Sequence, residues 1–325
     1  VNNQQAEYLE LVSSRKISLH ELKLLVEQCK NNPEDINSKL RSLKAFKTIK
    51  PLQLPEDVGY LCLWQKEYPR LLKDIYDPPA VIFYKGDIDV LSRRRISVVG
   101  SRRVDSEAIE STKRLASELS KEFVIVSGLA YGVDQIAHES VLEAGGAAVA
   151  VLPGSVNNPV PEGNRRLAEP IVQTGLLVSE MPPGSEIFKG SFPRRNRIIA
   201  GLSESTIVTA AGRQSGALIT ARHASQYGRQ VFAFPGSAYN GLMQGNNFLI
   251  KSLTATLVEG AEDILKEMGV EVTKTQTNRF EPEEEQLLRT LSGRAKSIGE
   301  LTTEFDKPLG DILSLLTRMQ LKGFI

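Results

Sequence analysis

The densest group of residues able to do chemistry lies between Phe188 and Gly201. Residues 188–197 contain four basic and two aromatic side chains and no acidic one. Pro193 fits the first turn of a helix, where the missing N–H of proline costs nothing. That helix would begin with three arginines, Arg194, Arg195 and Arg197. The helix macrodipole disfavours cations at this end, whereas a bound anion favours them, so the stretch is either a solvated basic helix start or one side of an anion site, for example for a phosphate backbone.

Small and polar residues also follow several predicted strands, at the points where helices begin. These turns are Gly100-Ser101-Arg102-Arg103, Ser127-Gly128 continuing to Asp134, Pro153-Gly154-Ser155, and Ala211 to Gly216 with its Ser215-Gly216 pair. Glycine lets a backbone approach a ligand closely, and helix N-termini offer free N–H groups. Together with Arg102 and the basic cluster 189–197, these turns predict an anion-binding edge. They contain neither G-x-G-x-x-G nor G-x-x-x-x-G-K-[ST], which disfavours a nicotinamide or ATP site and predicts no cofactor.

A regular alternation of strands and helices from Ile96 onward positions these turns. The predicted strands are 96–99, 123–126, 147–152, 176–178, 206–209, 231–234 and 256–258, preceded by one at 80–84. The predicted helices between and after them are 106–119, 133–143, 165–173, 193–202, 217–227, 247–251 and 262–267. The strands are short β-branched runs, typical of strands buried on both faces. Strands alternating with helices predict an α/β fold with a doubly wound, mostly parallel sheet, whose ligands bind at the carboxyl ends of the strands.

The two ends of the chain differ from this central pattern. Residues 1–60 predict a small all-α module, with a capping box at Ser18 to Glu21 and an amphipathic run that includes Ile36 and Leu40. Residues 61–269 form the predicted core, and residues 270–281 are polar and predict a linker. Residues 282–325 predict three helices, the second capped by Ser297 to Glu300, in a spacing similar to a winged helix whose wing is absent. This last segment carries six basic and eight acidic residues over 280–325, a net charge of −2, which favours contact with a protein rather than with duplex DNA.

Composition sets further bounds. The 325 residues carry a net charge of +1 and are 41% hydrophobic, so an anion site must come from local clustering rather than from overall charge. No apolar run approaches the roughly 18 residues that a membrane span needs, and no secretory pattern opens the chain. Cys29 and Cys62 show no C-x-x-C spacing and are expected to be reduced structural thiols in a cytoplasmic protein, with no metal bound.

Catalytic constellations are sparse. His138 and His223 lie inside predicted helices and are expected to be packed rather than reactive. Asp134, Glu139 and Glu180 are candidate acids near strand ends, but their spacing matches neither a metal cluster nor a nucleophile–base pair. The sequence therefore predicts a protein that is not an enzyme.

Single-stranded nucleic acid fits the available residues better, since such sites pair a basic groove with aromatic rings on which bases stack. Phe188 and Phe192 bracket Lys189, and Tyr131 and Tyr239 fall on the same side of the predicted sheet. We expect Phe188 to pack in the core, while Phe192 is at least as well suited to exposure. The run Arg93-Arg94-Arg95 precedes the first strand of the alternation and is expected to be solvated at the opposite edge.

The same turns resemble the DNA-processing protein A (DprA/Smf) family. The resemblance runs from about Tyr68 to Met268 and rests on a specific set of segments in this order. They are Val99-Gly100-Ser101-Arg102, Ser127 to Asp134 with Ala137-His138, Phe192 to Ser203, Ser215 to Ala221, and Val231 to Gly236. One departure is the segment Asn157 to Glu162, where relatives commonly have a Tyr-Pro pair.

The resemblance implies an extended Rossmann-type core that binds single-stranded DNA, forms a homodimer, and helps load the RecA recombinase during natural transformation. It implies that Arg102 and Lys189 contact DNA, with Phe192 stacking on a base. It also implies a sterile-alpha-motif-like module at the start of the chain and a winged-helix-like module at its end. The remaining expected DNA contacts are Gly100, Ser101, Ser127, Gly128, Arg194, Arg195, Arg197, Ser215 and Gly216, where the three arginines either line the groove or support it.

Two other functions compete with this one. The first is a Rossmann-type nucleotide or phosphoribosyl hydrolase that uses the same edge of the sheet, although the P-G-G-x-G-T-x-x-E signature of one such family is missing. The second is a pure protein-interaction scaffold.

Overall fold

Short strands with buried side chains run through the middle of the larger part of the chain. The structure is a computed structural model, and it describes residues 19–29, 32–42, 52–270, 281–292 and 296–321. The chain divides into two compact units, Val1–Val270 and Glu271–Ile325, each of which has its own hydrophobic core.

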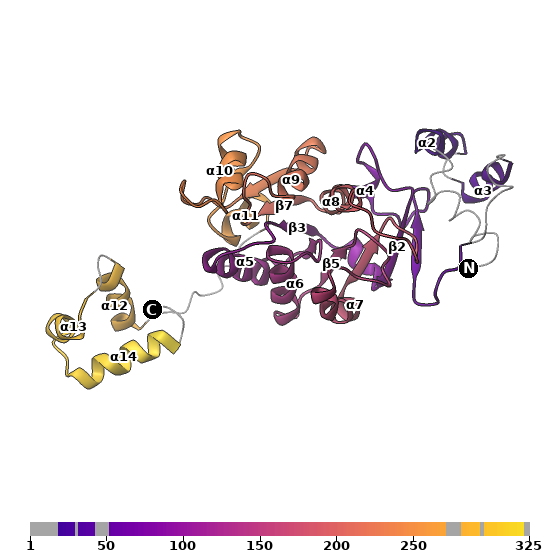
Figure 1. The fold of residues 1–325 in the computed structure, drawn as a ribbon. Coiled ribbons are helices and arrows are strands. Elements are labelled where there is room, and N and C mark those ends of the chain that lie inside the picture. Colours follow the sequence, from indigo (N-terminus) through magenta and orange to yellow (C-terminus); the bar gives the residue numbers. More distant parts are fainter. Residues whose placement is uncertain (1–18, 30–31, 43–51, 271–280, 293–295, 322–325) are drawn as a thin grey trace. The chain divides into compact units, whose positions relative to one another are not determined.

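In the first unit, nine strands of the described chain form one sheet (Figure 1). Their order across the sheet is β1 (Gly59–Cys62), β2 (Val81–Gly86), β6 (Leu176–Ser179), β5 (Ala148–Val151), β4 (Val124–Ser127), β3 (Arg95–Val99), β7 (Ser205–Val208), β8 (Gln230–Ala233) and β9 (Thr256–Leu257). Strands β6 to β9 in this order are mutually parallel, while β2 pairs antiparallel with both β1 and β6. The predicted α/β fold with a mostly parallel sheet is confirmed.

The sheet is doubly wound around strand β3. The chain steps outward from β3 through β4 and β5 to β6, then returns to place β7 on the other side of β3. The register aligns Ile96 with Ile125 on one side and Ser97 with Thr206 on the other. The direction of winding therefore reverses between β3 and β7, and this switch point is where ligands bind in open α/β sheets.

Helices cover both faces of this sheet (Figure 1). Helices α5 (Ser106–Leu119), α6 (Val133–Glu143) and α7 (Ala168–Thr174) pack side by side on one face, with α11 (Ala261–Glu267) beside α5. Helices α4 (Arg70–Lys73), α8 (Ser191–Leu202) and α9 (Ala217–Gln226) pack together on the other. Helix α10 (Gln244–Lys251) contacts strand β8, and the 3₁₀ helices Ile88–Ser92 and Glu162–Leu167 complete the elements of the core.

Helix α5 shows why these segments become helices. The Asp105 side chain caps its start by accepting a hydrogen bond of 2.9 Å from the backbone N–H of Ala108. Its buried residues are Ala108, Thr112, Leu115, Ala116 and Leu119, a spacing that places them on a single helical face. The opposite face carries the polar residues, so the sequence pattern fixes which side meets the sheet.

Most predicted elements occur within a few residues of their predicted bounds, and the differences are local. Strand β1 and helix α4 were not predicted, because the short segment 51–78 is rich in turn signals. The predicted helix 165–173 is a 3₁₀ helix, Glu162–Leu167, followed directly by α7.

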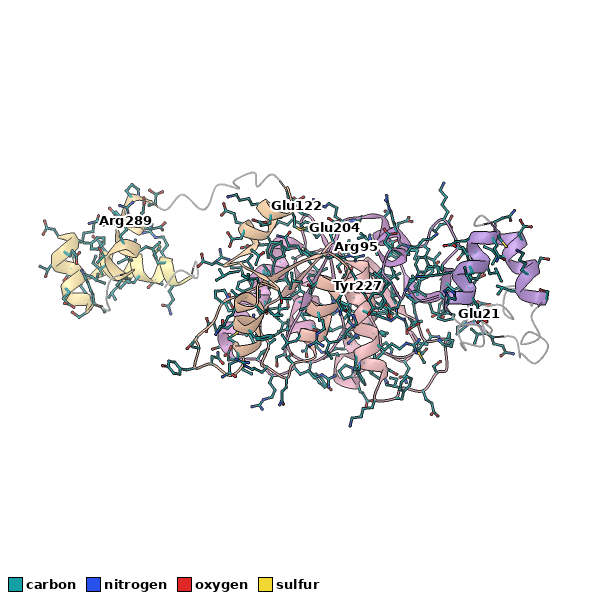
Figure 2. The ribbon with its side chains drawn as sticks, turned by 90° about the horizontal axis from the view of Figure 1, so that it is seen from above. Glu21, Arg95, Glu122, Glu204, Tyr227 and Arg289 are labelled. Carbon is teal, nitrogen blue, oxygen red and sulfur yellow. The ribbon has the colours of Figure 1, made fainter. Side chains whose placement is uncertain are left out.

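The prediction that Arg93-Arg94-Arg95 is a solvated run is wrong for Arg95. That side chain is buried and donates a 2.7 Å hydrogen bond to the carbonyl of Leu202, the last residue of α8. Arg94 forms an ion pair of 2.8 Å with Glu204, which lies beside Arg95 in Figure 2. A third arginine, Arg229, donates to the carbonyls of Ala200, Gly201 and Ser203. These contacts satisfy carbonyls that the end of α8 leaves without helical partners.

Helices α2 (Leu19–Gln28) and α3 (Pro33–Ser42) belong to the first unit, and their apolar residues include the buried Leu22, Ile36 and Leu40. Ser18 of the predicted capping box and residues 271–280 of the predicted linker lie outside the described residues. No helix in the described part of the chain is both long and apolar enough to cross a membrane.

The second unit contains α12 (Pro282–Ser292), α13 (Ile298–Phe305) and α14 (Leu309–Leu321). Its small core consists of Leu287, Leu301, Ile312, Leu315 and Met319. The predicted cap of the middle helix is confirmed, since Ser297 and Glu300 form a reciprocal capping box.

His138 on α6 is fully buried, as expected from its place in the helix, and neither ring nitrogen has a hydrogen-bond partner among the described residues. Burial lowers the pKa of His138 to about 3, and the positive charge of Arg195 acts in the same direction. Folding therefore keeps this imidazole neutral.

We expect the free energy of unfolding to fall as the pH drops from about 6.5 towards 3. Between these pH values His138 binds a proton in the unfolded chain but stays neutral in the folded protein. The free energy of unfolding therefore falls by up to about 1.4 kcal/mol per pH unit. Urea unfolding at about pH 7 and pH 5.5, above the range where most carboxylates titrate, should show a loss of about 1 kcal/mol. The loss should shrink markedly in His138→Leu and persist in His223→Leu. An equal loss in His138→Leu would contradict this assignment.

Candidate nucleic-acid interface

Two loops meet at the switch point between β3 and β7. The loop after β3 contains Gly100, Ser101 and Arg102, and the loop after β7 begins at Thr209. The backbone N–H of Ser101 donates a 2.6 Å hydrogen bond to the carbonyl of Ala210, so the two loops are directly joined. A side chain added at Gly100 would collide with Val133 and with the Ala210 carbonyl, which shows how tightly the backbones approach.

Arg102 and Phe192 come together at this edge although ninety residues separate them. The guanidinium carbon of Arg102 lies 5.4 Å from the centroid of the Phe192 ring, within the range of a cation–π contact. Arg102 is exposed and Phe192 is half-buried. Lys189 is exposed three residues before Phe192, in the loop that leads into α8. The pairing of the first turn with the basic stretch, which the sequence predicted, is therefore present in the structure.

The entry to α8 holds both of its aromatic residues where a ligand can reach them. The prediction that Phe188 packs in the core is wrong, since its side chain is 52% exposed. A tight turn explains the exposure: the Phe188 N–H donates to the Ser191 hydroxyl at 3.2 Å, and the Ser191 N–H returns to the Phe188 carbonyl at 2.9 Å. No side chain caps the start of α8 within the described residues.

Arg195 is buried and holds the ends of two strands together. Its guanidinium donates to the carbonyl of Gly128, after β4, at 2.5 Å and to the carbonyl of Val151, the last residue of β5. Burial lowers the pKa of Arg195 to about 10, and nearby Asp134 opposes that shift. Burial raises the pKa of the Asp134 carboxyl, while Arg195 and the N–H groups of Gly128 and Ala130 lower it. Arg195 thus stabilises the site from the protein interior and does not line its surface.

Arg194 and Arg197 share one carboxylate. Glu180, just after β6, accepts ion pairs of 2.8 Å from each of them, and Arg197 also pairs with Asp77 at 3.3 Å. Arg197 is buried and Arg194 is half-buried. The adjacent Asn196 donates a 3.2 Å hydrogen bond from its side chain to the carbonyl of Gly216. This geometry favours the supporting role for these arginines over the lining one.

The other expected contact residues divide by depth. Ser127 and Gly128 are buried, with the Ser127 hydroxyl donating 2.7 Å to the Val98 carbonyl and Gly128 leaving the room that the Arg195 guanidinium fills. These two positions therefore lie beneath the surface that a nucleic acid could touch. Ser215 is half-buried and Gly216 is exposed at the start of α9.

Gly132 keeps the first turn in place. Its φ angle is +77°, and a Cβ atom there would stand 2.3 Å from the Ser101 carbonyl oxygen and 2.7 Å from that of Arg102. The next residue, Val133, donates its N–H to the same Ser101 carbonyl at 3.1 Å. The loop after β4 therefore sets the path of the loop that carries Arg102.

One further pair of residues at this edge was not predicted from the sequence. Arg213, in the loop after β7, lies over the ring of Phe248 on α10, with 5.6 Å between its guanidinium carbon and the ring centroid. Arg213 lies in the turn from Ala211 to Gly216, so its position after a predicted strand was a usable signal. Phe248 offered no signal, because only the fold brings α10 next to that turn.

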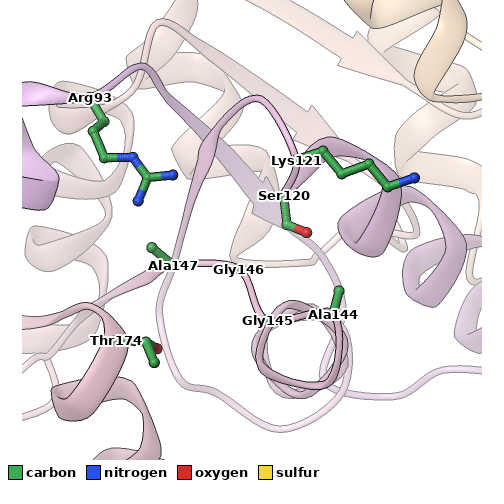
Figure 3. Close-up of a pocket in the computed structure, with 8 residues that line it drawn as sticks. All are labelled: Arg93, Ser120, Lys121, Ala144, Gly145, Gly146, Ala147 and Thr174. Atoms are coloured by element: carbon green, nitrogen blue, oxygen red, sulfur yellow. The ribbon is translucent and has the colours of Figure 1, made fainter.

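A depression of about 310 Å³ lies at the other edge of the sheet, among the strand starts (Figure 3). Its lining residues are Arg93, Ser120, Lys121, Ala144, Gly145, Gly146, Ala147 and Thr174. Helices α5, α6 and α7 all end there, so their partially negative carbonyl ends face it and disfavour an anion. In Figure 3 the Lys121 side chain points away from Arg93, so the two cations do not converge on one ligand.

Comparison with known proteins adds a family to this geometry. The family model for DNA recombination-mediator protein A matches residues 59–269. The chain is 43% identical over 200 residues to DNA processing protein DprA of Streptococcus pneumoniae, covering 62% of this chain and 71% of that protein. It is 39% identical over 242 residues to DNA processing protein DprA of Bacillus subtilis, covering 74% of this chain and 79% of that protein.

Solved structures agree with this similarity. The crystal structure of DprA from Streptococcus pneumoniae matches with a TM-score of 0.63 and 35% identity, covering 82% of this chain and 93% of that one. DNA processing protein A from Helicobacter pylori, a protein with a unique single-stranded DNA binding mode, matches with a TM-score of 0.59 and 30% identity. That match covers 65% of this chain and 95% of the other.

Gly132→Ala should destabilise the protein more than Gly145→Ala. Both glycines have positive φ angles, +77° and +71°, so both substitutions carry a conformational cost on the order of 1–2 kcal/mol. Only at Gly132 would the new methyl group also collide with backbone carbonyls, because nothing lies within 4 Å of a Cβ at Gly145. Urea unfolding of the two variants measures the difference, and equal losses would contradict the role assigned to Gly132.

Arg195→Met should lower the free energy of unfolding by about 3–5 kcal/mol, because it leaves the Gly128 and Val151 carbonyls unpaired and Asp134 uncompensated. The matched control is Arg213→Met, which removes an exposed guanidinium and should change stability by no more than about 0.5 kcal/mol. Chemical denaturation of both variants tests this, and a stable Arg195→Met protein would show that the buried guanidinium is dispensable.

Proposed function

The chain belongs to the DNA recombination-mediator protein A family, and from this membership we propose that it binds single-stranded DNA and processes incoming DNA during natural transformation. The observation that carries the proposal is the contact of exposed Arg102 with the half-buried ring of Phe192 at the switch point, with exposed Lys189 three residues before that ring. A basic groove with an aromatic platform is the general arrangement for binding single strands.

Each of these three side chains has its own task. Arg102 and Lys189 hold backbone phosphates, which requires cations that no protein carboxylate neutralises. Neither has an ion pair within the described part of the chain, in contrast to Arg194 and Arg197. Phe192 offers one ring face to a base. Because the guanidinium of Arg102 lies beside this ring, the two side chains can bind the phosphate and the base of the same nucleotide. The start of α8, which no side chain caps within the described residues, adds a favourable dipole for phosphate.

The function needs no catalytic step, and the candidate acids and bases at this edge are buried or held in ion pairs. His138 and Asp134 are buried. Glu180 is held by two arginines. The structural roles of these side chains support a binding protein over the alternative predicted from the sequence, a nucleotide or phosphoribosyl hydrolase.

The finer parts of the proposal rest on the family resemblance. They are a homodimer in the cytoplasm that protects incoming DNA and helps load the RecA recombinase onto it, with no cofactor or metal. Residues 1–60, which include α2 and α3, are proposed as a sterile-alpha-motif-like module. The three helices of the second unit are proposed as a winged-helix-like module that contacts a protein, in keeping with the net charge of −2 over residues 280–325.

Substitutions at the three side chains should separate phosphate binding from stacking. Arg102→Ala and Lys189→Ala should each weaken binding of single-stranded DNA and flatten the slope of log affinity against log salt by about 0.7, the contribution of one phosphate contact. Phe192→Ala should cost on the order of 1–3 kcal/mol with the slope kept. Fluorescence anisotropy with a labelled oligonucleotide across a salt series measures both quantities.

The control is Arg93→Ala, which removes an exposed arginine at the opposite edge and should leave affinity and slope unchanged. Wild-type binding by all three variants would show that the site lies elsewhere. Absence of single-strand binding by the unaltered protein at low salt would favour the scaffold, and product release from nucleotides would favour the hydrolase.

A further inference from the structure

A second arginine–aromatic pair lies on the same edge of the sheet as the first. The guanidinium carbon of Arg213 stands 5.6 Å from the ring centroid of Phe248, against 5.4 Å between Arg102 and Phe192. Arg213 is exposed and Phe248 is 48% exposed, so both remain open to a ligand. Arg213 has no ion pair within the described residues. The pair therefore repeats the chemistry of the first site with different elements, the loop after β7 and helix α10.

Exposed aromatic side chains concentrate along this edge. Among the described residues, five aromatic side chains are strongly exposed, Tyr76, Tyr131, Phe188, Tyr239 and Phe248. Tyr76 is the exception in position, and its ring contacts Tyr227 at a centroid distance of 5.4 Å. The other four follow the carboxyl ends of β4, β6 and β8. Water-exposed rings gathered on one edge are typical of a binding surface, since isolated exposure would scatter them over the molecule.

Direct contacts join the two pairs into one surface. Asn196, four residues after Phe192, donates its side chain to the carbonyl of Gly216 in the loop that carries Arg213. That loop in turn accepts a 2.7 Å hydrogen bond at the Ala211 carbonyl from the N–H of Gly245, at the start of α10. Hydrogen bonds therefore link the helix that carries Phe192, the loop that carries Arg213 and the helix that carries Phe248.

The loop after β8 is fastened to the loop that carries Arg102 as well. The Asn240 side chain donates a 2.9 Å hydrogen bond to Asp105, which also caps α5. Asp105 thereby has two hydrogen-bonding partners on the protein. A hydrogen bond therefore connects the loop that carries Arg102 with the loop that leads into α10.

We infer that Arg213 and Phe248 form a second subsite for the same single strand, with Arg213 on a phosphate and Phe248 stacked on a base. The inference rests on the proposed function and extends it: the strand runs from Lys189, Arg102 and Phe192 across the loop after β7 to α10. A short oligonucleotide fills only the first subsite, and a longer one fills both.

The test compares short and long oligo-dT probes, about 4 and about 20 nucleotides long, with the full chain. Phe248→Leu, which keeps an apolar side chain without a ring, and Arg213→Ala should bind the short probe as wild type does. Both should bind the long probe more weakly, Phe248→Leu by about 5- to 150-fold. Arg213→Ala should also flatten the salt slope for the long probe by about 0.7. Ultraviolet crosslinking of an iodouracil-labelled long probe should map to the peptide that contains Phe248.

Several results would overturn the inference while leaving the proposed function intact. Wild-type affinity of both variants for the long probe, with Arg102→Ala and Phe192→Ala still impaired, would remove the second subsite. So would equal weakening on both probes, or a changed oligomeric state in Phe248→Leu without loss of long-strand affinity. Failure of the unaltered protein to bind either probe would instead defeat the proposed function itself.

Discussion

The buried guanidinium of Arg195 is the contact on which the arrangement of the binding edge depends. It reaches from α8 to the backbone carbonyls of Gly128 and Val151 and so fastens one helix to the ends of two strands. A buried charge is costly unless its hydrogen bonds are satisfied, and here main-chain carbonyls and the nearby Asp134 compensate it. At the other end of α8, Arg95 and Arg229 complete the terminal carbonyls in the same way. Helix α8 is thereby held near its start by the buried Arg195 and at its end by the buried Arg95 and the half-buried Arg229.

The basic residues at this edge therefore fall into two groups, one that stabilises the fold and one that is available to a ligand. Arg195 and Arg197 are buried, and Arg194 shares Glu180 with Arg197, so their charges are used inside the protein. Lys189 and Arg102 remain exposed and free of carboxylates within the described chain, so their charges are available to an anion. Because the supporting arginines hold α8 in place, the first turn of the helix presents Phe192 to Arg102, and the loop before it carries the exposed Lys189.

Much of this could be predicted from the sequence, and the limits have physical causes. Short β-branched runs between helices predicted the parallel sheet, and the turn at Gly100 to Arg102 predicted one side of the site. Strand β1 escaped prediction because its four residues carry little pattern of their own and are ordered by pairing with β2. Residue type alone could not show that Arg95 is buried, because its burial depends on a contact with the distant Leu202. Nor could it show that Phe188 is exposed, because its exposure depends on the turn with Ser191.

The polarity of the sheet explains how a chain with a net charge of only +1 can hold a polyanion. All parallel strands end at one edge, where the following helices begin and direct their N–H groups and positive dipole ends outward. The opposite edge gathers the ends of α5, α6 and α7, whose carbonyls offset the charge of Arg93 and Lys121. Basic side chains at the two edges are therefore not equivalent. Those at the carboxyl edge act with the backbone dipoles, and there both arginine–aromatic pairs are found.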